Sequence, residues 1–253
     1  MIPLYRNIFD ALLITGAAGG IGHAIAFAAA PYAQALFLID IDTDRLCALR
    51  HDLLKHHPDL FVATFSGSVA DELFIDEAFT SIKDSTHSLS AAIHAASILR
   101  GSSGLVSGLD LTVPEWQSII DINLTGSFIL SRAVLRHFIA NKCSGDLLLF
   151  GSENAFNPYP YDAPYAASKA GVVALAESLN EEVMRYGIRV QSLSPSAVDT
   201  PLWDQNNSVL PRPSTMLSPS YVADIALSLL TLPRDGFVRN LQIFPTKTRK
   251  RKR

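Results

Sequence analysis

Short apolar runs alternate along the whole chain with longer segments in which apolar residues recur every three or four positions. The apolar runs predict seven strands, at 11–15, 35–40, 60–65, 89–95, 146–151, 188–194 and 241–244. The periodic segments predict helices at 20–30, 43–56, 70–84, 114–141, 163–186 and 219–231. Runs that are apolar at nearly every position are typical of parallel strands covered on both faces. The pattern therefore predicts an α/β fold, a single doubly wound parallel sheet of about seven strands with helices on both faces.

One long interval, 200–217, has little regular pattern and is rich in Pro, Asn and Ser, with Trp203 and Met216 inside it. Loops of this length usually carry function or are unstructured. Two interpretations stay open, a surface excursion and a lid over a small-molecule pocket, and the mixture of apolar and polar residues favours the lid. We expect one domain over 1–246, followed by a basic tail at 247–253.

Composition excludes several classes of protein. The chain has 253 residues, 48% of them apolar and 18% charged, which is typical of a globular protein with a sizeable core. Cys47 and Cys143 lie far apart and lack the spacing of metal ligands, so we expect neither a disulfide framework nor a metal site. No apolar run has the length of a membrane span, and residues 1–10 lack the layout of a signal peptide. These features predict a cytoplasmic protein without a membrane partner.

The net charge of −3 conceals a strong asymmetry. Six of the 21 basic residues lie in the tail at 247–253, so the body of the chain is acidic. Binding of nucleic-acid phosphates requires clustered Lys and Arg, and we therefore expect no nucleic-acid partner for the body. The tail is typical of a solvated, disordered end, although a nuclear-localisation or RNA-binding role for it stays open.

A glycine-rich turn connects the first predicted strand to an Ala-rich helix. It contains Gly16, Gly19, Gly20 and Gly22, with Ile21 before the last glycine. Glycines in this place permit a tight turn and a close approach of the backbone to a pyrophosphate, and the following helix offers free amides to the phosphates. The turn predicts a dinucleotide site, with a simple tight connection as the alternative.

An acidic residue ends the second predicted strand. Asp40 lies 24 positions after Gly16, at a spacing where a carboxylate can accept hydrogen bonds from the ribose hydroxyls of an adenosine. It would repel the 2′-phosphate of NADP, and Ile41 follows it instead of Arg or Lys, so we expect NAD as the preferred cofactor. In the alternative interpretation Asp40, Asp42 and Asp44 only solvate a loop and cap a helix.

Several polar residues suit acid–base chemistry. Tyr165 and Lys169 lie one helical turn apart on the same face of a predicted helix, where an ammonium can stabilise a phenolate. Ser152 lies at the carboxyl end of the fifth strand, where doubly wound sheets bind their ligands. Asn123 lowers the helix propensity of the predicted helix 114–141, which suggests a structural hydrogen bond or a site.

Taken together, these elements resemble the short-chain dehydrogenase/reductase family. The resemblance extends from about Ala11 to Thr246, and it rests on TGxxxGxG at 15–22, on Asn123, Ser152, Tyr165 and Lys169, and on a segment at 194–200 that is similar to the family's SPGxVxT. It implies a Rossmann-type NAD(P)-binding domain. It also implies an oxidoreductase that interconverts a secondary alcohol and a carbonyl by hydride transfer, similar to 3-oxoacyl and other carbonyl reductases.

The resemblance also implies roles for residues. Tyr165 would be the general acid or base, Lys169 would hold the nicotinamide ribose and lower the pKa of Tyr165, Ser152 would orient the carbonyl, and Asn123 would hold a relay water. Cofactor contacts are expected at Gly16, Gly19, Gly20, Ile21, Gly22, Asp40, Ile41, Val69, His94, Ala96, Tyr165, Lys169, Val198 and Thr200. Substrate contacts are expected at Ser152, Asn154, Tyr159, Tyr165 and Trp203.

Some positions depart from the family pattern. His94–Ser97 replaces NNAG, Ser68 replaces the Asp expected before Val69, and Ser196 replaces the Gly of SPG. His94 lies on an apolar strand, where a packed or hydrogen-bonded core histidine is the more common role. The departures support a second hypothesis, a catalytically silent dinucleotide-binding sensor or regulatory protein, but the complete catalytic set favours the enzyme. We expect a homodimer or homotetramer, with helices 114–141 and 163–186 at a subunit interface.

Overall fold

The computed structural model describes residues 8–207 and 209–246, and over these residues the chain forms one parallel sheet of seven strands. The strands are β1 (Phe9–Thr15), β2 (Ala33–Asp40), β3 (Phe61–Ser66), β4 (Leu89–His94), β5 (Asp146–Phe150), β6 (Arg189–Pro195) and β7 (Asn240–Ile243). Their order is β3-β2-β1-β4-β5-β6-β7. The strand order reverses direction between β1 and β4, so the ligand crevice of a doubly wound sheet is expected at their carboxyl ends. The predicted fold class is confirmed.

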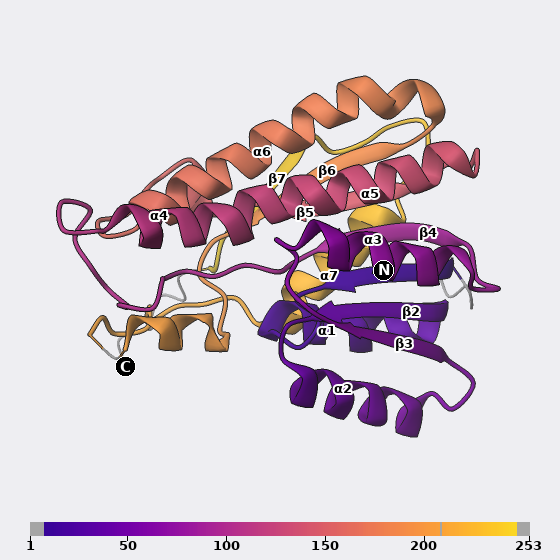
Figure 1. Ribbon diagram of the computed structural model, residues 1–253, viewed down its shortest axis with the longest axis horizontal. Coiled ribbons are helices and arrows are strands. Elements are labelled where there is room, and N and C mark those ends of the chain that lie inside the picture. Colours follow the sequence, from indigo (N-terminus) through magenta and orange to yellow (C-terminus); the bar gives the residue numbers. More distant parts are fainter. Residues whose placement is uncertain (1–7, 208, 247–253) are drawn as a thin grey trace, which may run out of the picture.

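Two helical layers cover the sheet (Figure 1). The helices are α1 (Gly20–Ala29), α2 (Thr43–His56), α3 (Glu72–Lys83), α4 (Val113–Ile120), α5 (Gly126–Ala140), α6 (Ala163–Val183) and α7 (Pro219–Leu230). Successive side chains of a strand point to opposite faces. Leu12 and Ile14 of β1 therefore pack in one core with α1, α2 and α7, whereas Ala11 and Leu13 pack in a second core with α3, α5 and α6.

The sheet is less completely covered at one edge than the sequence predicts. β3 lies at the edge beside β2, and several of its side chains are only half-buried, with Phe61 45% exposed. An edge strand has a neighbour on one side only, so an apolar run there does not require full burial. The expectation that every apolar run is covered on both faces is wrong for this strand.

The segment predicted as one helix at 114–141 contains a break in its winding. Thr112 and Glu115 form a capping box at the start of α4, and a π turn, η2 (Asp121–Thr125), separates α4 from α5. Asn123 lies on this turn and is fully buried. π turns inside α-helices are rare and occur frequently at functional sites. The single regular helix expected from periodicity is therefore corrected to two helices joined by a π turn.

The stretch Val113–Ala140 also tests the expectation that no segment of the chain spans a membrane. Among the described residues, Val113–Ala140 is long and apolar enough to span a bilayer by length and composition, contrary to the expectation from the sequence. Half of its most apolar window is buried, and α5 contributes Leu130, Val134 and Phe138 to the second core. The stretch is therefore a core helix of this domain, and the cytoplasmic location stays a prediction.

The interval 200–217 is more ordered than its composition suggests. It begins with a short 3-10 helix, η5 (Pro201–Asn206), and Val198 pairs with Leu217 in an isolated parallel bridge that closes the segment at its base. Arg212 binds both Asp199 and Asp204, so the segment is held to its own beginning by ion pairs. Its function as a lid stays a prediction.

Candidate active site

The glycine turn after β1 has a geometry that larger residues cannot adopt. Gly16 has φ +65°, and a Cβ on it would lie 2.6 Å from the backbone nitrogen of Ala96 at the end of β4. A Cβ on Gly22 would lie 2.1 Å from the carbonyl oxygen of Gly16. Real Cβ atoms do not approach other atoms this closely, so both positions require glycine. The turn therefore lies directly against the segment that follows β4, and the start of α1 lies directly against the turn.

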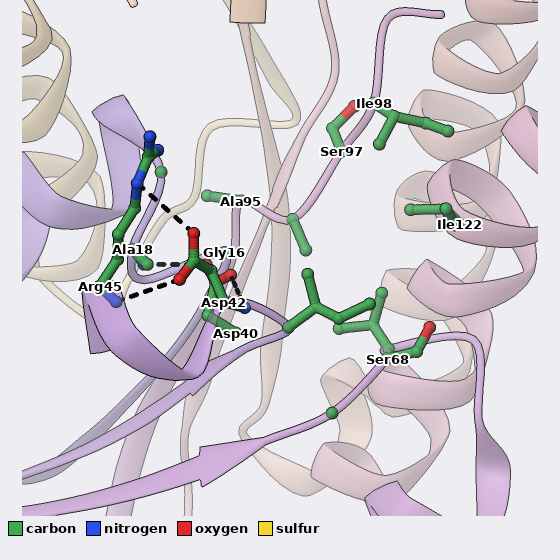
Figure 2. A pocket seen from close by; sticks show the side chains of 15 residues that line it. Gly16, Ala18, Asp40, Asp42, Arg45, Ser68, Ala95, Ser97, Ile98 and Ile122 are labelled. Atoms are coloured by element: carbon green, nitrogen blue, oxygen red, sulfur yellow. Dashed lines mark hydrogen bonds and ion pairs between the residues drawn. The ribbon is translucent and has the colours of Figure 1, made fainter. Parts of the chain in front are cut away.

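A cavity of about 300 Å³ opens beside this turn, at the carboxyl ends of the first four strands (Figure 2). Asp40, Asp42 and Arg45 lie on one side of it, and Ser97, Ile98 and Ile122 lie on the other. Its volume is at the lower end of the range for small-molecule sites. Six residues that the sequence assigns to cofactor binding line this cavity: Gly16, Gly19, Asp40, Ile41, Val69 and Ala96.

The carboxylate of Asp40 supports the glycine turn as well as facing the cavity. Its Oδ2 accepts a hydrogen bond from Ala18 N at 2.8 Å, and its Oδ1 accepts one from Asp42 N at 3.0 Å (Figure 2). Asp42, in turn, caps α2 by accepting from Arg45 N at 3.1 Å. Of the three aspartates that the alternative interpretation considered as helix caps, Asp42 is the one that caps α2. A carboxylate has about four acceptor positions, so Asp40 retains capacity for a further donor in the cavity.

His94 lies in the interior and does not line the cavity. Its Nδ1 is 2.7 Å from Thr15 Oγ1, whereas its buried Nε2 has no hydrogen-bond partner among the described residues. Burial, with a smaller contribution from the positive charge of Lys169, lowers the pKa of His94 to about 3. The structure therefore agrees with a core role for the His94 side chain, and a cofactor contact at His94 stays a prediction.

Tyr165 lies in the first turn of α6 and is buried close to the end of β5. Burial raises its pKa to about 12, an effect opposed by the nearby Ser152 hydroxyl. The Asp162 carboxylate raises this pKa further, whereas Arg100 and the hydroxyl of Ser97 lower it. The structure thus brings Tyr165 and Ser152 together, as the sequence predicts, and adds a third hydroxyl from the segment after β4.

Lys169 lies one turn further along α6 and is also buried. Its Nζ donates a hydrogen bond to the carbonyl oxygen of Phe150 at 2.8 Å, and it lies 5.7 Å from the centroid of the Tyr165 ring. Burial lowers the pKa of Lys169 to about 7, so its charge titrates near neutral pH. The nearest partner of the ammonium is therefore a backbone carbonyl, and a lowering of the pKa of Tyr165 by Lys169 stays a prediction.

The side chain of Asn123 connects η2 to the segment that follows β4. Its Oδ1 accepts from Ile98 N at 2.9 Å and from Ser97 Oγ at 3.1 Å. Its Nδ2 donates to Ile98 O at 2.8 Å and to Ser168 Oγ at 3.1 Å. Protein groups thus occupy all four hydrogen-bonding positions of the amide. A relay water at this residue stays a prediction, and in this arrangement it would have to bind the backbone.

The residues expected to contact substrate have protein partners of their own. Asn154 is buried, donates to Asp162 Oδ2 at 2.5 Å and accepts from Tyr159 N at 3.1 Å. The exposed Tyr159 hydroxyl donates to Glu153, and Trp203 Nε1 donates to Val198 O at 2.8 Å. Their assignment to substrate binding stays a prediction.

The remaining predicted cofactor contacts lie outside the 300 Å³ cavity. Thr200 is buried and its side chain lies against Gly20 of α1, and Val198 is buried next to Leu217. Ile21 is half-buried at the start of α1. These residues surround the carboxyl ends of β1 and β6, so the structure brings the glycine turn and the start of the 200–217 segment together.

Sequence reasoning missed two charged residues beside Tyr165. Arg100 and Asp162 are both buried, and Arg100 Nη2 lies 2.5 Å from Asp162 Oδ1. Arg100 lies in a stretch without periodicity, and Asp162 resembles an ordinary helix cap before Pro164. A buried ion pair between segments 62 positions apart leaves no local signal in the sequence.

The fold and this arrangement define a class of protein, the oxidoreductases with a Rossmann-type dinucleotide-binding domain. The family profile described as short chain dehydrogenase matches residues 10–210. The chain belongs to this short-chain dehydrogenase/reductase family, which makes it an oxidoreductase of the kind that acts on CH–OH groups.

Relatives and solved structures agree with this assignment. An uncharacterized oxidoreductase of Staphylococcus epidermidis is 28% identical over 233 residues, covering 92% of this chain and 96% of that protein. The structure of levodione reductase superposes with a TM-score of 0.85 at 25% identity, covering 94% of this chain and 97% of the other. A 3-oxoacyl-[acyl-carrier protein] reductase from Brucella melitensis, with bound NAD, gives a TM-score of 0.78 at 25% identity and covers 92% and 89% of the two chains.

Proposed function

We propose that this protein is an NAD-dependent oxidoreductase that interconverts a secondary alcohol and a carbonyl, with Tyr165 as the general acid or base. The observation that carries the proposal is the placement of the Tyr165 phenol beside the Ser152 hydroxyl, in a buried site at the carboxyl end of β5. Two hydroxyls that converge on one point can hold a carbonyl oxygen and transfer a proton to it.

The residues at the cavity fit a nicotinamide dinucleotide. The close approach of Gly16 to the end of β4 leaves backbone free to contact a pyrophosphate, and the start of α1 follows at once. The cofactor supplies the hydride chemistry when it is bound. The protein supplies position and charge, and Asp40, Gly16 and Gly19 are the described residues that would hold the cofactor's adenosine and phosphates.

The chain's own residues would manage the proton. Ser152 would donate a hydrogen bond to the substrate oxygen and orient it, and Tyr165 would give its proton to that oxygen in reduction or take it in oxidation. Because burial raises the pKa of Tyr165 to about 12, the phenol is protonated at neutral pH and is poised to act as an acid. Oxidation would therefore require a positive charge near the phenol, such as the Lys169 ammonium.

We propose NAD as the preferred cofactor because Asp40 faces the cavity. A 2′-phosphate placed there would meet the like charge of this carboxylate and of the neighbouring Asp42. Among the described residues, Arg45 is the one cation in the lining; its Nε lies 3.4 Å from Asp42 Oδ2, and its side chain is mostly exposed.

A fluorescence titration of the purified protein with NADH and with NADPH tests the cofactor half of the proposal. We expect NADH to bind more tightly, and we expect the double variant Asp40→Ala, Ile41→Arg to shift the preference toward NADPH. The single variant Ile41→Arg is the control, because it adds the positive charge and keeps the hydrogen bonds of Asp40 to Ala18 and Asp42. Equal affinity of the wild type for both nucleotides would overturn the NAD preference, and binding of neither would overturn the enzyme assignment.

We also propose that the protein is a homodimer through α4, α5 and α6. Trp116, Phe128 and Ile139 of α4 and α5 are between 37% and 43% exposed, which leaves apolar surface on these two helices. Light scattering coupled to size-exclusion chromatography tests this proposal. A monomeric mass at micromolar concentration would contradict it, and a mass of four chains would extend it to a tetramer.

A further inference from the structure

Two buried charges beside Tyr165 have no part in the reaction proposed above. Arg100 comes from the connection between β4 and α4, and Asp162 immediately precedes α6. Each residue is 7% exposed. Desolvation of two charges offsets most of their attraction, so a buried ion pair is weak evidence for a contribution to stability. The position of this pair therefore needs another explanation.

Asp162 does not make the contacts that its position favours. It is the N-cap residue of α6, yet its carboxylate makes no hydrogen bond to the first helical amides. It binds Arg100 and Asn154 instead. Tyr161, immediately before it, has φ +69°, a left-handed conformation that is uncommon and strained for a bulky side chain. The chain thus accepts backbone strain next to a carboxylate that is used for Arg100 and not for the helix.

Arg100 is held at each of its nitrogens. Its Nε donates to Asn206 Oδ1 at 3.1 Å, its Nη1 donates to Leu99 O at 3.3 Å, and its Nη2 donates to Asp162. Its backbone nitrogen donates to Gln205 Oε1 at 2.9 Å. Two of these partners belong to η5, at the start of the 200–217 segment. Three of the five guanidinium N–H groups are therefore engaged by protein acceptors, which hold the guanidinium in place.

Asp162 lies three residues before Tyr165 at the start of α6, and Arg100 is bound to Asp162, so both charges lie at the turn of α6 that carries Tyr165. The two charges act on the phenol with opposite signs. The negative charge of Asp162 raises the pKa of Tyr165, whereas the positive charge of Arg100 lowers it. The other groups that face the phenol are the hydroxyls of Ser152 and Ser97 and the ammonium of Lys169, from the β5–α6 connection, the segment after β4 and α6. The pair therefore places one positive and one negative charge at this site in addition to Lys169.

We propose that Arg100 and Asp162 are positioning residues for proton transfer at Tyr165, and that η5 locks Arg100 beside the phenol. This inference rests on the proposed function. While the segment is in place the two charges act on the phenol in opposite directions. Loss of either partner leaves the other one uncompensated in a buried site, where a charge within reach of a titrating group shifts its pKa by one unit or more.

The test compares the directions in which two substitutions shift the pH profile of kcat. Asp162→Asn should move the pH profile of kcat for alcohol oxidation to lower pH by about one unit, because Arg100 then acts alone on the phenol. Arg100→Gln should move the profile to higher pH by a similar amount. Arg100→Lys keeps the positive charge and should restore the profile to within a few tenths of a unit of the wild type. If Asp162→Asn does not fold, Asp162→Ser removes the same charge and should give the same sign.

A second buried ion pair in this chain provides a matched control. Arg189 Nε lies 2.6 Å from Asp146 Oδ1, and both side chains are buried at the opposite ends of β5 and β6 from Tyr165. Asp146→Asn should lower the melting temperature at least as much as Asp162→Asn does. It should leave the pH profile unchanged, because its loss of charge is remote from the phenol.

Failure of the inference is distinct from failure of the proposed function. Turnover is measured on cyclohexanone, ethyl acetoacetate and their alcohols with NADH or NAD, and the phenolate of Tyr165 is titrated by ultraviolet absorption. The titration curve of each variant is corrected by subtracting the curve of the same variant carrying Tyr165→Phe, which leaves the signal of Tyr165. This absorption measurement needs no substrate.

Shifts of the same sign in Asp162→Asn and Arg100→Gln, or an equal shift in Asp146→Asn, would overturn the inference. Full turnover in Tyr165→Phe would overturn the proposed function and would leave the phenolate titration as the test of the pair.

Discussion

The two halves of the candidate site are held together in different ways. The dinucleotide half is formed by backbone: Gly16 lies against the segment after β4, Gly22 lies against Gly16, and Asp40 accepts a hydrogen bond from Ala18 N of the turn. The catalytic half is held by buried polar side chains from distant segments, with Arg100 on Asp162 and Asn123 on the backbone of the segment after β4. The geometry of the dinucleotide half therefore depends on close packing of backbone atoms. The geometry of the catalytic half depends on charge and hydrogen bonding.

This difference predicts which property of the protein a substitution in each half should change. A substitution in the glycine turn adds atoms where there is no room, so its effect should be on folding and cofactor affinity. A substitution around Tyr165 changes the electrostatic environment of one phenol, so its effect should be on rate and pH dependence while cofactor affinity is retained. Four predictions test this separation.

The largest expected effect is on turnover. Tyr165→Phe removes the proton donor and should lower kcat by roughly a hundredfold to ten-thousandfold, the usual contribution of a general acid or base. Its affinity for NADH should stay within twofold of the wild type, because the phenol lies in the catalytic half. Steady-state kinetics and a fluorescence titration measure both quantities. Tyr221→Phe is the control, since that side chain is exposed on α7 and has no assigned role in the site, and a similar loss of rate there would argue against a specific role for Tyr165.

The next largest effect is on the glycine turn. Gly22→Ala places a Cβ 2.1 Å from the Gly16 carbonyl oxygen, and the turn must open to admit it. Overpacking of this kind costs about 3 kcal/mol, so NADH affinity should fall by about a hundredfold, together with the melting temperature. Gly236→Ala is the matched control, because nothing lies within 4 Å of a Cβ there. An unchanged NADH affinity in Gly22→Ala would mean that the turn does not hold the cofactor.

A third effect should appear in the pH dependence of stability. Burial lowers the pKa of Lys169 from 10.5 to about 7, so between these values the unfolded chain holds one more proton at this residue than the folded protein does. The free energy of unfolding of the cofactor-free protein should therefore rise with pH, by about 1 kcal/mol per pH unit from this group. Lys169→Met should lack this rise. Denaturant unfolding of both proteins at about pH 7.5, 8.5 and 9.5, values within this window, measures the rise. If the unfolding free energy changes with pH in the same way in both proteins, the Lys169 ammonium is not buried in solution.

The smallest effect concerns acid stability. Burial lowers the pKa of His94 from 6.5 to about 3, so in this range the unfolded chain takes up a proton that the folded protein cannot. Stability should therefore fall as the pH drops below 6.5, and His94→Asn should lose less stability than the wild type on acidification. Thermal melts at about pH 7, above this range, and at about pH 5, within it, compare the two proteins. His51→Asn changes an exposed histidine and should behave like the wild type. The same acid sensitivity in His94→Asn and the wild type would exclude this histidine as the cause.

The same contrast explains how much could be predicted from the sequence. The glycine turn, Asp40 and the strands are local patterns, and the predicted fold class and family are confirmed. The π turn at Asn123 and the half-covered β3 were missed, because periodicity reports neither an extra residue in a turn nor the neighbours of a strand. Arg100 and Asp162 were missed because their significance arises only when distant loops meet. Ser152, Tyr165 and Lys169 were found as a set by spacing, and their roles stay predictions.

The π turn also constrains the number of residues between α4 and α5. An α-helix advances by about 100° for each residue, so the one additional residue in a π turn rotates everything beyond it by that angle. In this protein the phase change at η2 lets Asn123 reach the segment after β4, while Leu130, Val134 and Phe138 of α5 still face the sheet. Deletion of a single residue between Asp121 and Thr125 would restore a regular helix and turn one of these two faces away from its partner. In this stretch of the chain, the number of residues is therefore as constrained as their identity.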